Sequence, residues 1–423
     1  MINNSSAYKA SRQFAQEMDD ADQLSTFRNQ FYFPQHNKRD AIYLCGNSLG
    51  LQPKAAREII DQELNDWAEF GVEGHFQAKR PWFAYHTFFT ESLAKLVGAN
   101  VKEVVAMNTL TVNLHLLMLS FYRPTKQRYK IIMEAGAFPS DMYAMETQAI
   151  MHGFDPEKAV IEVGPRKGEH TIRIEDIEET IEKHKKNLAL VVFGGVNYYT
   201  GQFFDIKKIT ELAHKAGALA GFDLAHATGN KVLHLHEWNV DFACWCSYKY
   251  LNSGPGAVGG IFVHEKHAKD SKTFKLAGWW GHDEKTRFKM KKGFKPMKTA
   301  ESWQMSNAQV MNMAAHRASL DLFDKVGMDK LAEKSLHLTA YTEFLLKQLS
   351  NLKFEIITPS NPLERGCQLS LLFKAKGKEV FDKLQSKGVI ADWREPNVIR
   401  IAPVPMYNSF VDVYTLYEIM KSV

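Results

Sequence analysis

The sequence predicts an α/β protein in which helices cover a large, mainly parallel sheet and a smaller α+β domain is attached to it. The first observation is length: the chain has 423 residues, and a single core rarely grows beyond roughly 250–300 residues. The second is an alternation of short apolar runs with helical patterns through the middle of the chain. The third is a change to mixed helices and strands after residue 307. Two domains are therefore expected.

The larger domain is predicted from the apolar runs. Runs typical of buried strands lie at 130–133, 188–193, 218–222, 242–246 and 258–263, and helical patterns lie between several of them at 141–152, 175–185 and 205–215. Continuous apolar strands separated by helices favour a parallel sheet that is covered on both faces. An amphipathic helix over 53–70, with Pro53 near its first turn, precedes these runs. We assign residues 46–295 to this domain.

The smaller domain is predicted from both ends of the chain. A helical stretch covers about 7–28, and a long helical pattern runs from 307 to about 350. A strand at 368–373, a helix at 378–387, strands over 389–401 around a turn at 395–397, and a final helix from Phe410 follow. Residues 1–45 and 296–423 are therefore expected to form one α+β domain.

Composition excludes several classes of protein. The chain is 45% hydrophobic and 24% charged, which is ordinary for a globular protein and argues against disorder or a fibrous repeat. The net charge of +5 is small, and the densest basic stretch lies at 287–298 with Phe288 and Phe294 between the charges. A solvated loop, or a rim that attracts anionic ligands, explains this stretch better than a nucleic-acid surface.

Four cysteines, at positions 45, 244, 246 and 367, are too few and too scattered for a disulfide framework and indicate a reducing compartment. Cys244 and Cys246 alternate within a predicted strand, which favours small buried hydrophobes over a metal site. The N-terminus has no apolar signal-peptide core, and no run of about 18 apolar residues occurs. A cytoplasmic protein is expected.

Asp223 is the first residue that indicates chemistry. It ends the apolar run 218–222, and a carboxylate at the carboxyl end of a parallel strand points into the crevice where open α/β sheets bind ligands. Taken alone, this aspartate is as compatible with a helix cap or a structural role.

Lys249 changes that interpretation. It follows the next strand and precedes a Gly-Pro-Gly turn at 254–256. A lysine amine becomes nucleophilic when its pocket lowers its pKa, and it then forms a Schiff base with an aldehyde. Pyridoxal 5′-phosphate (PLP) requires such a lysine, and it requires a carboxylate that keeps its pyridine nitrogen protonated. The spacing of Asp223 and Lys249 therefore predicts a PLP enzyme that acts on an amino acid.

The remaining needs of PLP can be met nearby. Thr109 and Thr111 lie where a helical pattern begins, and a helix N-terminus with hydroxyl donors suits a phosphate, although an ordinary N-cap fits equally well. Phe138 follows a strand, where an aromatic ring can stack on the pyridine. Asp141 is compatible with a cofactor contact or with a helix cap alone.

Other motifs are absent. His264 and His267 do not form the H-E-x-x-H zinc motif, and His226, His234 and His236 have no cysteine or carboxylate partner at ligand spacing, so no metal site is predicted. The glycines do not form G-x-G-x-x-G, and no Walker A or G-x-S-x-G motif occurs.

Long motifs in the chain closely resemble those of kynureninases. The residues that carry the resemblance are 221–227 (GFDLAHA) and 241–251, together with 46–50, 79–82, 108–119, 138–141, 199–202, 278–282 and 400–405. The resemblance covers nearly the whole chain. It implies the aspartate-aminotransferase-like PLP fold, a homodimer with its sites at the subunit interface, and hydrolytic cleavage of the Cβ–Cγ bond of kynurenine or 3-hydroxykynurenine, which yields anthranilate or 3-hydroxyanthranilate and alanine.

The resemblance also implies roles around the cofactor. Lys249 would hold the PLP aldehyde, Asp223 would pair with the pyridinium nitrogen, and Phe138 would stack on the ring. The phosphate would be held by the main chain of Leu110 and by Thr111 and Tyr248. Asp141 and His226 would lie at the cofactor edge, and Trp279 and Asn307 would come from the partner subunit.

For the substrate, the resemblance implies that Arg400 binds the α-carboxylate through its bidentate guanidinium. His75, Ser306 and Asn307 would contact the aromatic end, and Trp280 would form an apolar wall. Polar groups at that end favour the hydroxylated ring, although an added hydroxyl is poorly discriminated when nothing is left unpaired without it.

Catalysis would depend on Lys249 for removal of the Cα proton, on Asp223 for charge stabilisation and on Tyr248 for proton delivery. Gly194 stands where relatives carry a serine near the cofactor, and position 280 is Trp where relatives can have Phe.

Rival functions are also compatible with the sequence. A cysteine desulfurase or an aminotransferase would share the fold, although a desulfurase needs a reactive loop cysteine and none of the four lies in an obvious loop. A non-catalytic binding module of the same fold would keep the pocket without the reaction. A nucleic-acid binder would use the basic stretch at 287–298.

Overall fold

The computed structural model describes residues 8–423 and contains a seven-stranded sheet, in the order β6-β12-β11-β10-β9-β7-β8. Its strands are β6 (Val104–Ala106), β7 (Lys130–Glu134), β8 (Val160–Val163), β9 (Leu188–Gly194), β10 (Leu219–Asp223), β11 (Phe242–Trp245) and β12 (Gly260–Val263). Neighbouring strands from β8 to β11 pair in parallel, and β12 is antiparallel to both β11 and β6. The mainly parallel α/β fold is thus confirmed.

Alternate residues of the central strands belong to two different cores. Val191, Phe193 and Phe222 face one core, whereas Leu190 and Val192 face the other, as the period of two in a strand requires. Helices α8 (Ile174–His184) and α9 (Ile206–Lys215) pack on the first face, and α5 (Leu110–Phe121) and α6 (Pro139–Met151) pack on the second. Both faces are covered, so these strands are apolar throughout.

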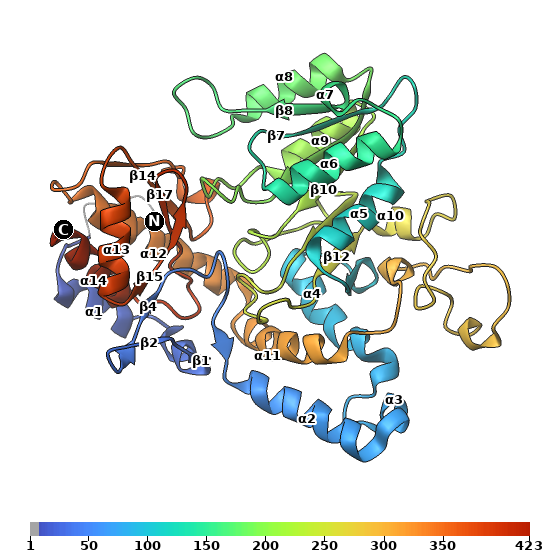
Figure 1. Ribbon diagram of the computed structural model, residues 1–423, viewed down its shortest axis with the longest axis horizontal. Helices are drawn as coiled ribbons and strands as arrows, with labels where there is room; N and C mark the ends of the chain where they lie inside the picture. The colour runs from blue at the N-terminus through green and yellow to red at the C-terminus, as the bar shows by residue number, and fades with distance from the viewer. Residues whose placement is uncertain (1–7) are drawn as a thin grey trace.

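The second domain is built on a four-stranded antiparallel sheet, in the order β13-β14-β17-β16. Its strands are β13 (Phe354–Ile356), β14 (Leu369–Phe373), β16 (Asp392–Arg394) and β17 (Val398–Ile401), and its helices are α12 (Met328–Lys347), α13 (Gly377–Ser386) and α14 (Phe410–Lys421). Helix α1 (Arg12–Asp20) packs on α14, and β4 (Ile42–Tyr43) pairs with β15 (Val389–Ile390). The two ends of the chain therefore lie side by side, in blue and red in Figure 1.

The chain passes from the large domain to the small domain through two consecutive helices. Helix α11 (Val310–Val326) packs on α2 (Ala55–Phe70) and α4 (Thr90–Val97) beneath the large sheet (Figure 1). Met313 and Phe323 of α11 belong to the core of the large sheet, whereas Leu338 and Tyr341 of α12 belong to the core of the small domain. The exact division between the domains stays a prediction.

Some expected elements differ from those observed. The long helical pattern predicted from 307 to about 350 forms two helices, because Gly327 adopts φ +81° between them, a conformation that glycine adopts readily. The helix predicted over 7–28 is α1 followed by a short 3₁₀ turn at Ser25–Gln30, and its first residue lies outside the described residues. Strands β6, β8 and β13 were not predicted, because runs of three or four residues carry little periodicity. None of the helices described is long and apolar enough to cross a membrane.

Candidate active site

A pocket of about 210 Å³ lies at the carboxyl ends of the parallel strands, where Asp223 ends β10 and Gly194 ends β9. It brings together eight residues that were predicted from the sequence: Leu110, Thr111, Phe138, Asp141, Asp223, His226, Tyr248 and Lys249. Because these residues are up to 139 positions apart in the sequence (249 − 110), only the sheet brings them to one place.

The amine of Lys249 lies inside this pocket, and its Nζ is 3.2 Å from Nε2 of His226. An ammonium group can only donate, so Nε2 of His226 accepts this hydrogen bond. Burial, assisted by the positive charge of Lys249, lowers the pKa of His226 well below its usual range. His226 is therefore neutral and serves as an acceptor that orients the lysine amine.

Two aromatic rings flank the same amine. Nζ of Lys249 lies 5.8 Å from the ring centroid of Phe138 and 5.7 Å from that of Tyr248. Phe138 immediately precedes α6, and its ring meets that of Tyr198 edge to face at 5.3 Å. A planar ligand ring next to Lys249 would therefore have an aromatic side chain available for stacking.

Three carboxyl groups line the same pocket, and each belongs to the end of a strand or the start of a helix. Asp223 accepts a hydrogen bond from the backbone N–H of Ala225 at 2.8 Å, and burial raises its pKa, although the charge of Lys249 opposes that shift. Burial and the neighbouring Asp223 raise the pKa of Asp141 well above its usual range. Asp141 is the third residue of α6 and not its N-cap, so the interpretation as a cap alone does not hold.

Glu134 is the third carboxyl group, and it was not predicted from the sequence. It ends β7, as Asp223 ends β10, and this shared position at a strand end was the available signal. Its carboxylate accepts from the backbone N–H of Gly194 at 3.2 Å and from Asn197 at 3.4 Å. Burial raises its pKa to about 7. A side chain at position 194 would place its Cβ 3.1 Å from Oε1 of Glu134, so a serine there would crowd this carboxylate.

The N-terminus of α5 borders the pocket. Thr109 is the N-cap residue of this helix, but its side chain makes no capping hydrogen bond, so the ordinary capping role is not observed. Leu110 and Thr111 form the first turn and line the pocket with Tyr248. Free N–H groups, the helix dipole and adjacent hydroxyls together suit a phosphate group.

Arg400 lies behind the pocket on β17, and only 1% of its surface is exposed. Its Nε donates to Oδ1 of Asp392 at 2.9 Å, and its Nη1 donates to the carbonyl oxygen of Tyr198 at 2.6 Å. Nη2 is 2.8 Å from Asp392 but lacks a hydrogen bond of acceptable geometry. A buried guanidinium with a spare donor is suited to a carboxylate ligand.

Six expected site residues do not line the pocket of their own chain: His75, Trp279, Trp280, Ser306, Asn307 and Arg400. Trp280 is buried against Phe83 at 5.4 Å and under the guanidinium of Arg287 at 4.3 Å. Trp279 is 50% exposed. Arg287 itself is buried and donates to the carbonyl oxygen of Trp280, so it does not belong to an exposed basic surface.

The fold and site define a class of protein. The chain superposes on a cysteine desulfurase from Thermococcus onnurineus with a TM-score of 0.74, over 90% of this chain and 94% of that chain at 17% identity. It also superposes on a C-DES mutant with glycine covalently linked to its PLP cofactor, with a TM-score of 0.75 over 93% and 98% of the two chains at 15% identity. This is the fold of PLP-dependent enzymes of the aspartate-aminotransferase type, as expected.

Sequence comparison identifies the family. Residues 331–420 match the model of the kynureninase C-terminal domain. The chain is 55% identical to a kynureninase of Flavobacterium psychrophilum over 97% of both chains, and 49% identical to a kynureninase of Nematostella vectensis over 97% of this chain and 94% of that one. The chain belongs to the kynureninase family.

The buried Glu134 makes the stability of the ligand-free chain depend on pH. Its pKa is 4.5 without burial and about 7 in the folded chain, so the folded state holds the proton more tightly and stability falls as pH rises through that window. We expect this group to cost on the order of 3 kcal/mol of unfolding free energy between pH 4.5 and pH 7.

Urea denaturation of the wild type and of Glu134→Gln across this range measures that dependence. The difference between the two curves should change with pH only between about 4.5 and 7. A constant difference over the whole range would contradict the assignment.

Proposed function

We propose that this chain is a PLP-dependent hydrolase that cleaves the Cβ–Cγ bond of L-kynurenine or L-3-hydroxykynurenine, releasing anthranilate or 3-hydroxyanthranilate and L-alanine. The observation that carries the proposal is a single pocket in which Lys249 faces Asp223 beside the N-terminus of α5, in a chain 55% identical to a kynureninase over nearly its whole length.

The residues present fit PLP. An amine for the aldehyde, a buried carboxylate for the ring nitrogen and a helix N-terminus for the phosphate all line one pocket. The neighbouring Asp223 raises the pKa of Asp141, and a pyridinium nitrogen would supply a positive charge that stabilises both carboxylates. When bound, PLP provides an electron sink for the charge that develops at the substrate Cα.

The side chains of this chain would perform the proton transfers. Lys249, oriented by neutral His226, is the base for the Cα proton. Burial raises the pKa of Tyr248, which keeps its hydroxyl protonated and suits it to deliver a proton. Arg400 would bind the α-carboxylate through the donors left on its guanidinium, and Phe138 would stack on the cofactor ring.

We assign the remaining expected residues to a shared site in a homodimer. Trp279 and Asn307 would reach the cofactor of the partner subunit, whereas His75, Ser306, Asn307 and Trp280 would surround the aromatic end of the substrate. The pocket in one chain includes none of these residues. Polar groups at the aromatic end favour 3-hydroxykynurenine over kynurenine as the better substrate.

Desulfurase chemistry fits this chain poorly. That reaction needs an accessible thiolate nucleophile, but Cys244, Cys246 and Cys367 are buried. Cys45 is only partly buried, yet burial raises its pKa to about 12. The two cysteine desulfurases compared are each 17% identical to this chain, so they show the fold alone. All four cysteines are free, which supports a reducing compartment and, with it, the cytoplasm.

The first test is product formation by the wild type and by Lys249→Ala, with kynurenine and 3-hydroxykynurenine supplied separately. The wild type should release alanine and the aromatic acid, and the variant should lose about 10³-fold or more of this activity because it lacks both the Schiff base and the Cα base.

Lys231→Met is the matched control, since Lys231 is also buried but donates to backbone carbonyls of Leu363 and Arg365 outside the pocket. This variant should keep both the yellow colour of bound PLP and the cleavage activity. Failure of the wild type to cleave either substrate would defeat the proposal, and transamination products would favour an aminotransferase.

The second test concerns the carboxylate site. Arg400→Lys should raise KM by about 10–100-fold, because a lysine cannot replace a bidentate guanidinium that contributes roughly 1.5–3 kcal/mol. Arg394→Lys is the control, because Arg394 pairs with the same Asp392 at 3.0 Å but is more exposed. An unchanged KM in Arg400→Lys, or equal changes in both variants, would contradict the assignment.

The third test concerns the shared site. Lys249→Ala and Asn307→Ala chains, each inactive alone, should regain about a quarter of wild-type activity after they are mixed and exchanged, since a hybrid dimer contains one intact site. Recovery requires that Asn307 acts on the partner's cofactor. If hybrid dimers form and remain inactive, Asn307 does not act across the interface.

A further inference from the structure

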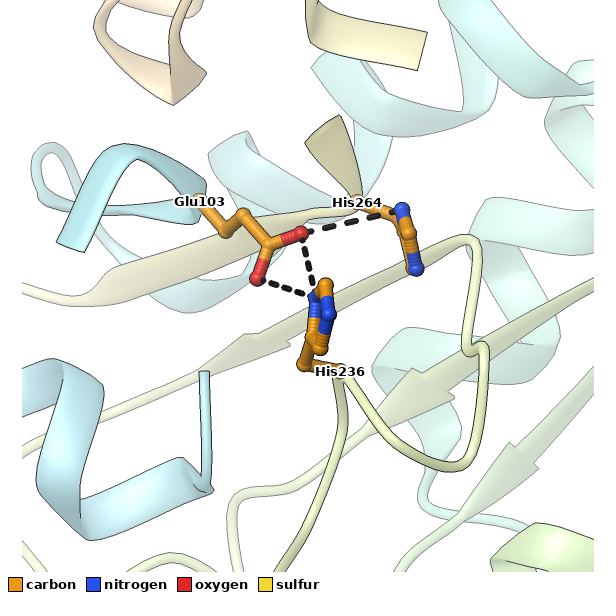
Figure 2. A group of neighbouring side chains, drawn as sticks. All are labelled: Glu103, His236 and His264. Atoms are coloured by element: carbon orange, nitrogen blue, oxygen red, sulfur yellow. Dashed lines mark hydrogen bonds and ion pairs between the residues drawn. The ribbon is translucent and has the colours of Figure 1, made fainter. Parts of the chain in front are cut away.

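A cluster of one carboxylate and two histidines lies at the edge of the large sheet opposite the pocket. Glu103 directly precedes β6, whereas the pocket residues Leu110 and Thr111 follow it. His264 directly follows β12, which is antiparallel to β6, and His236 lies in the loop before β11. One ligand atom from each of the three residues lies within 4.8 Å of the others. Figure 2 shows the carboxylate of Glu103 beside the two imidazole rings, with a contact to each, and the rings of His236 and His264 stack on one another with centroids 4.9 Å apart.

Glu103 is a fully buried carboxylate without a permanent positive partner. Its side chain is 0% exposed, and its ion pairs among the described residues are with His236 at 3.0 Å and His264 at 3.6 Å. No described lysine or arginine pairs with it. Burying a negative charge is costly unless a positive charge compensates it. A cation bound next to Glu103 would therefore be stabilised by the charge of this carboxylate.

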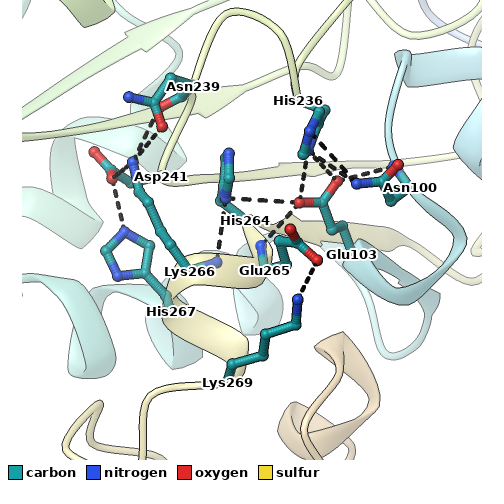
Figure 3. A network of polar contacts seen from close by, with 10 residues as sticks. All are labelled: Asn100, Glu103, His236, Asn239, Asp241, His264, Glu265, Lys266, His267 and Lys269. Carbon is teal, nitrogen blue, oxygen red and sulfur yellow. Dashed lines mark hydrogen bonds and ion pairs between the residues drawn. The ribbon is translucent and has the colours of Figure 1, made fainter.

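The neighbouring carboxylate shows the contrast. Asp241 is equally buried, but Nζ of Lys266 lies 2.9 Å from it, and His214 and His267 each donate to a different one of its oxygens at 2.7 Å. Figure 3 shows the two groups next to one another, with Lys266 on the side of Asp241. Its charge is already compensated, whereas that of Glu103 is not.

The protonation of His264 provides an independent observation. Its Nδ1 accepts the backbone N–H of Lys266 at 3.2 Å, so this nitrogen carries a lone pair and no proton. The same Nδ1 is the atom that lies 3.6 Å from Oε1 of Glu103. Two electron-pair donors thus face one another at a distance too long for a hydrogen bond. A metal ion between Nδ1 of His264 and Oε1 of Glu103 would attract both atoms. The weak hydrogen bond from the backbone N–H of Lys266 would then be lost.

We propose that Glu103, His236 and His264 bind a divalent transition-metal ion of the zinc type. Tetrahedral zinc with bonds of roughly 2.0–2.2 Å separates its ligand atoms by roughly 3.3–3.5 Å, and the observed separations from Glu103 of 3.0 and 3.6 Å bracket this value. Imidazole with carboxylate is a donor set that suits zinc. The side chain of His236 is 36% exposed, which leaves the fourth position to water.

The surrounding residues hold these ligands in place. The backbone N–H groups of Asn100 and Glu265 each donate to Glu103 at 2.8 Å, and the side-chain amide of Asn100 lies 3.1 Å from Nδ1 of His236. The backbone of His236 is itself bonded to Gly98 at 3.0 Å. Such contacts orient metal ligands. A bound ion would therefore tie together the start of β6, the loop before β11 and the end of β12.

The test uses the holoenzyme and zinc alone, in a buffer without phosphate and after treatment with a chelator. We expect about one zinc ion to bind per chain in equilibrium dialysis, with a rise in Tm because the ion binds only the folded state. His236→Gln should weaken this binding by at least about tenfold, and a Tm in the absence of zinc close to that of the wild type would show that this variant is folded.

His214→Gln is the matched control, because His214 holds the neighbouring Asp241 and not Glu103. It should retain zinc affinity within about threefold of the wild type. His264→Gln, a second ligand variant, should lose affinity as His236→Gln does. The proposal is overturned if the wild type binds no zinc, if His236→Gln binds it unchanged, or if His214→Gln is the variant that loses it.

Discussion

A partly buried amine that shares one pocket with three carboxyl groups is the constraint on which the site depends. Lys249, Asp223, Asp141 and Glu134 all line this pocket, and burial raises the pKa of all three acids. Grouping such residues in a low-dielectric site is unfavourable unless a scaffold over-determines their positions. The sheet provides that scaffold, and a cofactor with a cationic ring and an anionic phosphate would satisfy both ends of the pocket at once.

Strand direction explains where the clusters of acidic side chains lie in the large domain. The strands from β7 to β10 end at one edge, where Glu134, Gly194 and Asp223 end their strands and the pocket forms. The opposite edge carries Glu103 and Asp241 with their histidines. Between the edges the strands are apolar on both faces. The buried acids of this sheet thus lie at strand ends, where loops can reach them with hydrogen bonds.

The principal strands and the two residues that define the chemistry were predictable because each has a local signature. Continuous apolar runs predicted β7, β9, β10, β11 and β12. Asp223 and Lys249 were singled out because one ends a predicted strand and the other follows the next strand. Glu134 was missed although, like Asp223, it ends a strand, because the sequence alone does not show which acids at strand ends are buried. His236 was discounted as a ligand for a similar reason: Glu103 is 133 positions away, so no spacing rule relates them.

The sequence by itself determined the mainly parallel α/β architecture and the family, because apolar periodicity and short motifs are local properties of the chain. The tertiary structure alone decided which acids are buried, that Arg400 is held by Asp392, that helix α12 begins anew after Gly327, and that Glu103 meets two histidines. These features depend on contacts between residues far apart in the sequence, and on the loss of water that follows when the sheet and its helices close around them.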